Sequence, residues 1–253
     1  MSQTPIIQLK SLSKSFGSFQ VLNRLNLALE KDQVNIIIGR SGGGKSVLIK
    51  HIIGLMKPDS GQVLIKGRDI VPMNERQLAG IRQSFGMLFQ EAALFDSLNV
   101  MDNVAFPLQE HTRKTRAEIE DIVQARLASV GLSEMGQKMP SELSGGMRKR
   151  VGLARALVME PEIVLFDEPT SGLDPVMSAA INELILRTRQ EFHATCVVIS
   201  HDIQASMEIA DQIFMLYQGK IIARGSPGEI QESRDPVVRQ FIRGEASGPI
   251  KIN

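Results

Sequence analysis

The residues best placed for chemistry form a glycine-rich loop that can bind phosphate. Eight consecutive residues match the pattern G-x-x-x-x-G-K-[ST]: Gly39, Arg40, Ser41, Gly42, Gly43, Gly44, Lys45 and Ser46. Glycines let successive backbone N–H groups turn inward around an anion, and the positive end of a following helix adds to the attraction. In this pattern the lysine neutralises the β- and γ-phosphates, and the serine hydroxyl is a ligand of Mg²⁺. The loop therefore predicts binding of a nucleoside triphosphate with Mg²⁺.

The segments on either side of the loop have the pattern that such a loop requires. Val34 to Ile38 is an apolar, β-branched run that predicts a strand, and Val47 to Ile53 is typical of a helix. Strand, loop and helix in this order are the context in which the motif binds phosphate. The alternative is a glycine-rich turn that happens to precede a lysine, and the flanking segments disfavour it.

A pair of carboxylates follows a second apolar run. Ile163 to Phe166 is typical of a strand buried on both faces, and Asp167 and Glu168 come directly after it. Phosphoryl transfer needs an acidic group near Mg²⁺, so we expect Asp167 to hold the metal, directly or through water. Glu168 would then act as the general base that polarises an attacking water. An Asp-Glu pair at a strand end is common by chance, so this interpretation depends on the phosphate loop.

A third candidate site precedes the helix-like segment from Arg148 to Met159. Ser144, Gly145 and Gly146 offer a hydroxyl, bare backbone N–H groups and the positive end of a helix. In an isolated helix the same residues would be only an N-cap with flexible glycines.

These motifs, in this order, resemble those of the ATP-binding-cassette (ABC) family, and the resemblance covers essentially the whole chain. It implies that Gln90 contacts Mg²⁺ and the attacking water, that His201 contacts the γ-phosphate, and that Phe16 stacks on adenine. Ser171 to Asp174 resembles the family's D-loop. Each residue also has a plain structural alternative: Gln90 as a surface amide, His201 as a polar strand-end residue and Phe16 as part of the core.

Two residues depart from the family pattern. Val47 stands where a hydroxyl residue commonly follows the phosphate-loop serine. We therefore expect one side-chain hydrogen bond near the α-phosphate to be missing, at a cost of about 0.5–1.5 kcal/mol, while the backbone N–H of Val47 still contacts the nucleotide. Met147 replaces the usual final glutamine of the signature. The catalytic residues are intact, so we expect an active ATPase.

The resemblance implies an α/β fold of the P-loop NTPase (RecA-like) type: a mostly parallel sheet, an N-terminal antiparallel β portion and an α-helical insert. Residues 1–253 would form a single nucleotide-binding domain, with a helical subdomain at about 91–158. Alternating apolar residues predict two paired strands, Ile6 to Leu12 and Val21 to Leu29, and Gln218-Gly219 predicts a hairpin turn. Capping signals predict helix starts at Thr115, Asp174 and Ser226.

The expected assembly is a two-fold dimer. In the family, Ser144 and Gly146 contact the nucleotide that the phosphate loop of the other subunit holds, so a second copy of the chain would complete each site. The implied ligands are ATP and Mg²⁺. A formal net charge of +1 argues against nucleic acid as a partner, and the single cysteine, Cys196, leaves no internal disulfide.

The segment from Met87 to Val100, continuing through Asn103 to Leu108, resembles ATPases paired with MCE-type phospholipid transport systems of bacteria. That resemblance implies a transmembrane permease and an MCE-type substrate-binding protein as partners, with phospholipid handled by the complex. It places the chain peripherally on the cytoplasmic face of the inner membrane. Five apolar residues could dock the permease or belong to the core of the insert: Phe89, Leu94, Phe95, Leu98 and Val100.

Two other functions remain open at this point. One is an ABC ATPase for another solute, such as an amino acid or a metal ion. The other is a non-transport ABC protein, which is disfavoured because the chain has neither a long coiled-coil insertion nor a second cassette. A GTPase is excluded because no Asn-Lys-x-Asp element, which reads guanine, occurs in the sequence.

Overall fold

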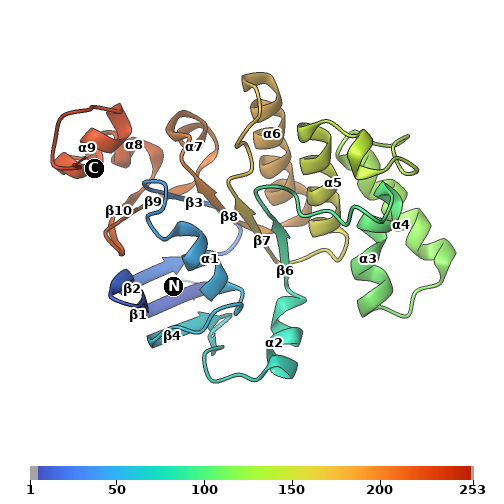
Figure 1. The fold of residues 1–253 in the computed structure, drawn as a ribbon, viewed down its shortest axis with the longest axis horizontal. Coiled ribbons are helices and arrows are strands. Elements are labelled where there is room, and N and C mark those ends of the chain that lie inside the picture. The colour runs from blue at the N-terminus through green and yellow to red at the C-terminus, as the bar shows by residue number, and fades with distance from the viewer. Residues whose placement is uncertain (1–4, 252–253) are drawn as a thin grey trace. The chain divides into compact units, whose positions relative to one another are not determined.

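The computed structural model describes residues 5–251, and the chain divides into two compact units (Figure 1). The first unit combines Met1–Ala79 with Val197–Asn253, and the second is Gly80–Cys196. The two ends of the chain therefore belong to one unit, and the middle of the chain folds as the other. The second unit contains the predicted helical insert and also strands on both sides of it, so it begins before residue 91 and continues beyond residue 158.

The first unit contains the phosphate loop. Its elements, in chain order, are β1 (Ile7–Phe16), β2 (Phe19–Leu29), β3 (Val34–Ile38), α1 (Lys45–Ile52), β4 (Ser60–Ile65), β5 (Arg68–Asp69), most of α2 (Glu75–Arg82), most of β8 (Thr195–Ser200), α7 (Ile203–Ile209), β9 (Gln212–Tyr217), β10 (Lys220–Gly225), α8 (Pro227–Gln231) and α9 (Pro236–Arg243).

An antiparallel sheet with the strand order β2-β1-β4-β5 forms the N-terminal part of this unit. Ile7 pairs with Leu29 and Leu9 with Leu27, so the alternating apolar residues of both strands share one buried face. Gly17, with φ 58°, supplies the left-handed turn between β1 and β2. The predicted pair of N-terminal strands is confirmed, and each strand is longer than its apolar pattern alone indicated.

A second sheet carries the strand that leads into the phosphate loop. Within the first unit its order is β10-β9-β3-β8. β3 runs parallel to β9, with Ile36 opposite Ile213, and every residue of β3 is buried. β9 and β10 are antiparallel and turn at Gln218 and Gly219, both of which have positive φ. The turn confirms the predicted hairpin. Burial of every residue of β3 explains why its sequence, which is apolar except at Asn35, does not alternate between apolar and polar residues.

A buried amide fixes the C-terminal segment to α9. The Gln240 side chain is 4% exposed; its Nε2 donates to the carbonyls of Glu245 (3.1 Å) and Ile250 (3.2 Å), and its Oε1 accepts from the Ile250 N–H (2.6 Å). A Cβ on Gly248 would lie 2.5 Å from this carboxamide, so only glycine fits there. These hydrogen bonds hold residues 244–251 against α9, and we call this segment the C-terminal hook.

The second unit contains a parallel strand pair and the helical insert. Its elements are β6 (Phe85–Leu88), α3 (Val100–His111), α4 (Arg116–Ser129), the 3₁₀ turn η1 (Pro140–Glu142), α5 (Gly145–Leu157), β7 (Ile163–Asp167) and α6 (Pro175–Phe192). β6 and β7 are parallel, with Leu88 opposite Phe166. A Cβ on Gly86 would collide with the carbonyl oxygen of Ala156, so glycine allows the end of α5 to approach β6 closely.

Helices α3, α4 and α5 contact one another in pairs and form the cluster seen in green and yellow-green in Figure 1. The predicted capping box at the start of α4 is present, because Thr115 accepts from the Glu118 N–H and the Glu118 carboxylate accepts from the Thr115 N–H. Asp174 caps α6 and Ser226 caps α8, also as predicted. Within residues 5–251 we find no helix that has both the length and the apolar character to cross a membrane.

Candidate functional site

The phosphate loop connects the end of β3 to the start of α1, as predicted. Gly39 follows β3 directly, and a Cβ there would lie 2.5 Å from the carbonyl oxygen of Leu216 in β9. Gly44 is the N-cap of α1, with φ 96°, and a Cβ there would lie 2.8 Å from the Val21 side chain. Glycine is therefore needed at both ends of the loop, for close approach at Gly39 and for close approach and positive φ at Gly44.

The start of α1 is arranged for an anion. The N-cap residue provides no side-chain hydrogen bond, and the first turn contains no acidic residue. The first N–H groups of a helix have no partner within it and carry the positive end of its dipole. The exposed Ser46 side chain belongs to this first turn, and the backbone of the half-buried Val47 follows it.

Lys45 lies over the loop. Its side chain is 5% exposed, and its Nζ donates to the carbonyls of Gly39 (2.8 Å) and Arg40 (3.0 Å). The Arg40 carbonyl also accepts from the Gly43 N–H (3.0 Å), which closes the loop into a tight turn. The Arg40 guanidinium donates from Nη1 to the carbonyl of Lys251 (3.0 Å), so the C-terminal hook reaches the phosphate loop.

Two further predicted residues lie in the first unit. Phe16, the last residue of β1, is 48% exposed, and the Lys14 ammonium lies 5.7 Å from its ring centroid. The ring is therefore a surface group available for stacking rather than part of the core. His201 follows β8 and is exposed, and its neighbour Asp202 caps α7 by accepting from the Ala205 N–H (3.0 Å).

The predicted acidic pair ends β7 in the second unit. Asp167 is the last residue of the strand, and both Asp167 and Glu168 are half-buried. Glu168 has φ 50°, a left-handed backbone that a non-glycine residue adopts only where its surroundings enforce it. The turn that follows is closed by a hydrogen bond from the Ser171 N–H to the Glu168 carbonyl (3.2 Å).

The signature residues begin α5 in the same unit. Ser144 is the N-cap, and its Oγ accepts from the Met147 N–H (3.2 Å). Ser144 and Gly145 are exposed, whereas Gly146 lies against the Met177 side chain, with which a Cβ would collide. The alternative reading of Ser144 as an N-cap is therefore correct, and the cap coexists with an exposed helix N-terminus.

Gln90 is exposed and lies just after β6. Its Nε2 is 3.5 Å from Ser171 Oγ, so the Gln90 side chain lies next to the turn at the start of the D-loop. Two cations of α5, which sequence reasoning missed, hydrogen-bond to main-chain carbonyls in the loop after Gln90 and in the D-loop turn. Arg155 donates to the carbonyls of Ala92 (2.7 Å) and Ala93 (2.8 Å), and burial lowers the pKa of its guanidinium. Lys149 Nζ donates to the Ser171 carbonyl (2.5 Å).

The predicted site residues divide between the two units. The first unit holds Phe16, the loop from Gly39 to Val47, and His201; the second holds Gln90, Ser144 to Gly146, Asp167 and Glu168. Within the first unit, Lys45 donates a hydrogen bond to the Arg40 carbonyl of the phosphate loop. Within the second unit, Gln90 contacts Ser171, whose N–H closes the turn after Glu168.

The proposed metal donors are chemically suited to Mg²⁺. They are a hydroxyl at Ser46, a carboxylate at Asp167 and an amide at Gln90, and all three present oxygen. Among residues 5–251 no group of three or more His, Cys, Asp or Glu side chains could enclose a metal ion.

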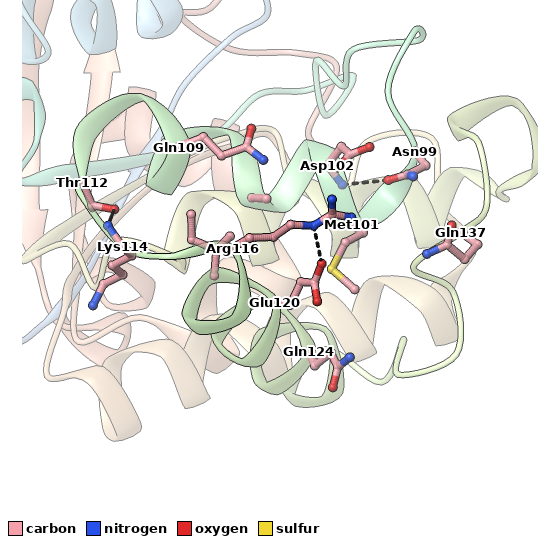
Figure 2. Close-up of a pocket in the computed structure, with 12 residues that line it drawn as sticks. Asn99, Met101, Asp102, Gln109, Thr112, Lys114, Arg116, Glu120, Gln124 and Gln137 are labelled. Carbon is pink, nitrogen blue, oxygen red and sulfur yellow. Dashed lines mark hydrogen bonds and ion pairs between the residues drawn. The ribbon is translucent and has the colours of Figure 1, made fainter.

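A separate groove of about 700 Å³ lies between α3 and α4 (Figure 2). Its walls mix acids and bases, with Asp102 and Glu120 balancing Lys114 and Arg116, and Arg116 Nε pairs with Glu120 at 2.9 Å. None of the predicted nucleotide-binding residues lines it. This groove is therefore not the nucleotide site.

The loop between Gln90 and α3 is held by a buried amide. Asn103 Oδ1 accepts from the Phe95 N–H (2.8 Å), and its Nδ2 donates to the carbonyls of Phe95, Leu98 and Asn99.

Phe95 is 43% exposed and its ring lies 4.8 Å from that of Phe106. Of the five apolar residues considered for docking, Phe89 and Phe95 are exposed and Leu94 and Leu98 are half-buried. Val100 is fully buried at the start of α3, so for this residue the alternative holds: it belongs to the core of the insert.

Comparisons with known proteins agree with this geometry. A family model described as "ABC transporter" matches residues 22–171. The "Probable ribonucleotide transport ATP-binding protein mkl" of Mycobacterium tuberculosis is 45% identical over 247 residues, covering 98% of this chain and 69% of that protein. The "Intermembrane phospholipid transport system ATP-binding protein MlaF" of Haemophilus influenzae is 40% identical, covering 98% of this chain and 94% of that protein. MlaF of Escherichia coli is 39% identical, with coverage of 97% and 91%.

Solved structures give the same picture. The cbiO1 protein of Clostridium perfringens, described as part of the ABC transporter complex cbiONQ, matches with a TM-score of 0.84 and 29% identity, covering 94% of each chain. The ATP-binding cassette MJ0796, described as a dimer in a post-hydrolysis state bound to ADP and Pi, matches with a TM-score of 0.81 and 30% identity. That match covers 87% of this chain and 98% of MJ0796, and it confirms the predicted fold class.

Proposed function

The chain belongs to the ABC transporter family and is an ATPase, and we propose that it powers phospholipid transport between the inner and outer membranes of a bacterium. The observation that supports the phospholipid role is the similarity to two MlaF proteins, each described as the ATP-binding protein of an intermembrane phospholipid transport system. The alignments cover 94% and 91% of those proteins, so the resemblance extends along nearly their whole length.

Ribonucleotide transport is the second candidate. The mycobacterial mkl protein is more similar in sequence, at 45% identity, and its description names ribonucleotide transport as probable. The present chain covers only 69% of that protein, however, whereas it spans nearly all of MlaF. This difference favours the phospholipid role.

In the proposed reaction, the phosphate loop binds ATP, and Lys45 turns its ammonium from the loop carbonyls toward the β- and γ-phosphates. Ser46, Asp167 and Gln90 would hold Mg²⁺, which when bound neutralises charge on the phosphate oxygens. Glu168 takes a proton from the attacking water, and His201 contacts the γ-phosphate. The Lys45 position supports this assignment, because its ammonium already lies against the loop, 2.8 Å from the Gly39 carbonyl.

The proposed working form is a dimer of two copies. The exposed N-terminus of α5, with Ser144 as its cap, would contact the nucleotide bound by the phosphate loop of the other copy. A two-fold axis completes both sites at once, and loss of the γ-phosphate on hydrolysis would release the contact. The proposed partners are a permease and an MCE-type protein, with the chain on the cytoplasmic face of the inner membrane.

The substrate class can be tested on the chain purified together with its membrane partners. After reconstitution in liposomes, ATP should drive transfer of a fluorescent phospholipid, and mass spectrometry should find phospholipid bound to the complex. A complex carrying Lys45→Ala is the control and should transfer none. ATP-dependent uptake of a radiolabelled ribonucleotide without lipid transfer would instead support the second candidate.

Permease docking can be tested at the loop after Gln90. Glutamate at both Leu94 and Phe95 should abolish co-purification with the permease, because two desolvated charges cannot be buried in an apolar interface. ATP binding by the isolated chain should be unchanged. Leu55→Glu is the matched control, since Leu55 is an exposed apolar residue (55%) of the first unit. Undiminished co-purification of the double variant would rule out docking through this loop.

A further inference from the structure

Lys149 is a buried cation that the family motifs leave without a role. It lies in the second turn of α5, five residues after Ser144, and is 6% exposed. A buried lysine is rare and is tolerated only where its ammonium is bonded, because burial penalises its charge. Here the ammonium donates to the carbonyl oxygen of Ser171, at 2.5 Å.

The charges that act on Lys149 come from the predicted catalytic loops. Burial lowers the pKa of its ammonium, and the negative charges of Glu91 and then Glu168 oppose that effect. Glu91 follows Gln90 in the chain, and Glu168 is the proposed base. The ammonium therefore lies within the electrostatic reach of both loops.

Ser171 connects the same elements by hydrogen bonds. Its carbonyl accepts from Lys149, its N–H donates to the Glu168 carbonyl (3.2 Å), and its Oγ lies 3.5 Å from Gln90 Nε2. The turn from Glu168 to Ser171 begins with the left-handed backbone of Glu168, which surrounding structure must maintain. Lys149 holds the other end of that turn.

We propose that Lys149 is a positioning residue for ATP hydrolysis: by holding Ser171 it fixes the turn that aims the Glu168 carboxylate. The inference rests on the proposed role of Glu168 as the base. Helix α5 would then have two roles. Its N-cap, Ser144, is expected to contact the nucleotide of the partner, and its Lys149 would position Glu168 of the same chain.

The test is a series of substitutions at Lys149, measured in the dimeric, partner-bound ATPase. Lys149→Met keeps the apolar stem and removes the donor and the charge. We expect kcat to fall about 10- to 100-fold, the loss typical of a misplaced catalytic group, with KM for ATP changed less than about twofold. Lys149→Arg, which keeps donor and charge, should recover most of the rate, and Lys149→Gln, a neutral donor, should be intermediate.

Controls separate positioning from a structural role. The melting temperature of Lys149→Met should stay close to that of the wild type, because replacing a buried cation by an apolar side chain of similar length is often neutral. Lys138→Met is the matched control; Lys138 is an exposed lysine of the same unit, paired with Glu142 at 2.9 Å, and its loss should leave kcat unchanged.

Two outcomes would overturn the inference. One is wild-type kcat for Lys149→Met in an assay where Glu168→Gln is inactive, which would leave the role of Glu168 intact and remove that of Lys149. The other is a parallel loss of ATP binding and melting temperature that arginine does not rescue, which would make Lys149 purely structural. Activity in Glu168→Gln would instead contradict the proposed base itself, so the two failures are distinguishable.

Discussion

Replacing Glu168 by glutamine is expected to stop ATP hydrolysis while leaving ATP binding intact. Glutamine has the same shape but cannot accept a proton from the attacking water, and loss of a general base typically costs 10² to 10⁴ in rate. The phosphate loop belongs to the other unit and is untouched, so the affinity for ATP should be close to that of the wild type. Single-turnover hydrolysis and equilibrium binding of a fluorescent ATP analogue measure the two quantities separately.

The same variant should accumulate as a dimer when ATP is present. If two nucleotides hold the copies together and hydrolysis separates them, blocking hydrolysis traps the closed state. Size-exclusion chromatography with and without ATP would show the shift. Glu134→Gln, a change of an exposed carboxylate in the same unit, serves as the control. Rapid hydrolysis by Glu168→Gln would remove Glu168 from the role of base.

The second large effect is expected from Ser144→Arg. Ser144 is exposed at the N-terminus of α5, and an arginine there would project into the space that the partner's γ-phosphate should occupy. Turnover should fall at least about 100-fold, as for removal of a donor that stabilises the transition state. ATP binding to the phosphate loop of the separate chain should not change.

Ser144→Arg also removes a helix cap, which costs about 1 kcal/mol of stability. Thr115→Arg controls for that loss, because Thr115 is likewise an exposed N-cap, at the start of α4. It should match Ser144→Arg in melting temperature but retain turnover. If Ser144→Arg lost ATP binding and turnover equally, the signature would not act on the nucleotide of another subunit.

Much of the fold could be predicted because its signals are local. The β3 run, the turn at Gln218 and Gly219, and the caps at Thr115 and Asp174 each depend on residues within one turn or one strand. The short β6 was missed, since it has only four residues and includes Gly86, which normally weakens a strand. Gly86 is there because α5 approaches closely, and that approach is not visible in a local pattern.

Three helices were also missed, α2, α7 and α9. The start of α9 did carry a usable signal: Asp235 accepts from the N–H groups of Val237 and Val238, and Pro236 occupies the first helical position. This is the same Asp-Pro arrangement that correctly predicted α6 at Asp174. The helix α7 is only seven residues long, too short for a periodic pattern to be distinctive.

The candidate site was predictable to the extent that its residues form contiguous motifs. The phosphate loop needs glycine at fixed positions, and its strand and helix are adjacent in the chain, so eight residues could be assigned together. Lys149 could not be assigned, because its partner is a main-chain carbonyl 22 residues away that any residue type at position 171 would provide. Arg155 was missed for the same reason, as it holds the carbonyls of two alanines.

The hydrogen bond between Arg40 and Lys251 has a practical consequence for work with this protein. Any tag or added segment placed shortly after Lys251 would begin next to the carbonyl that the phosphate-loop arginine holds. Such a fusion could pull on the nucleotide loop and lower the measured affinity for ATP without any change in the active residues. Measuring the affinity for ATP before and after removal of a cleavable tag would show whether the tag affects nucleotide binding.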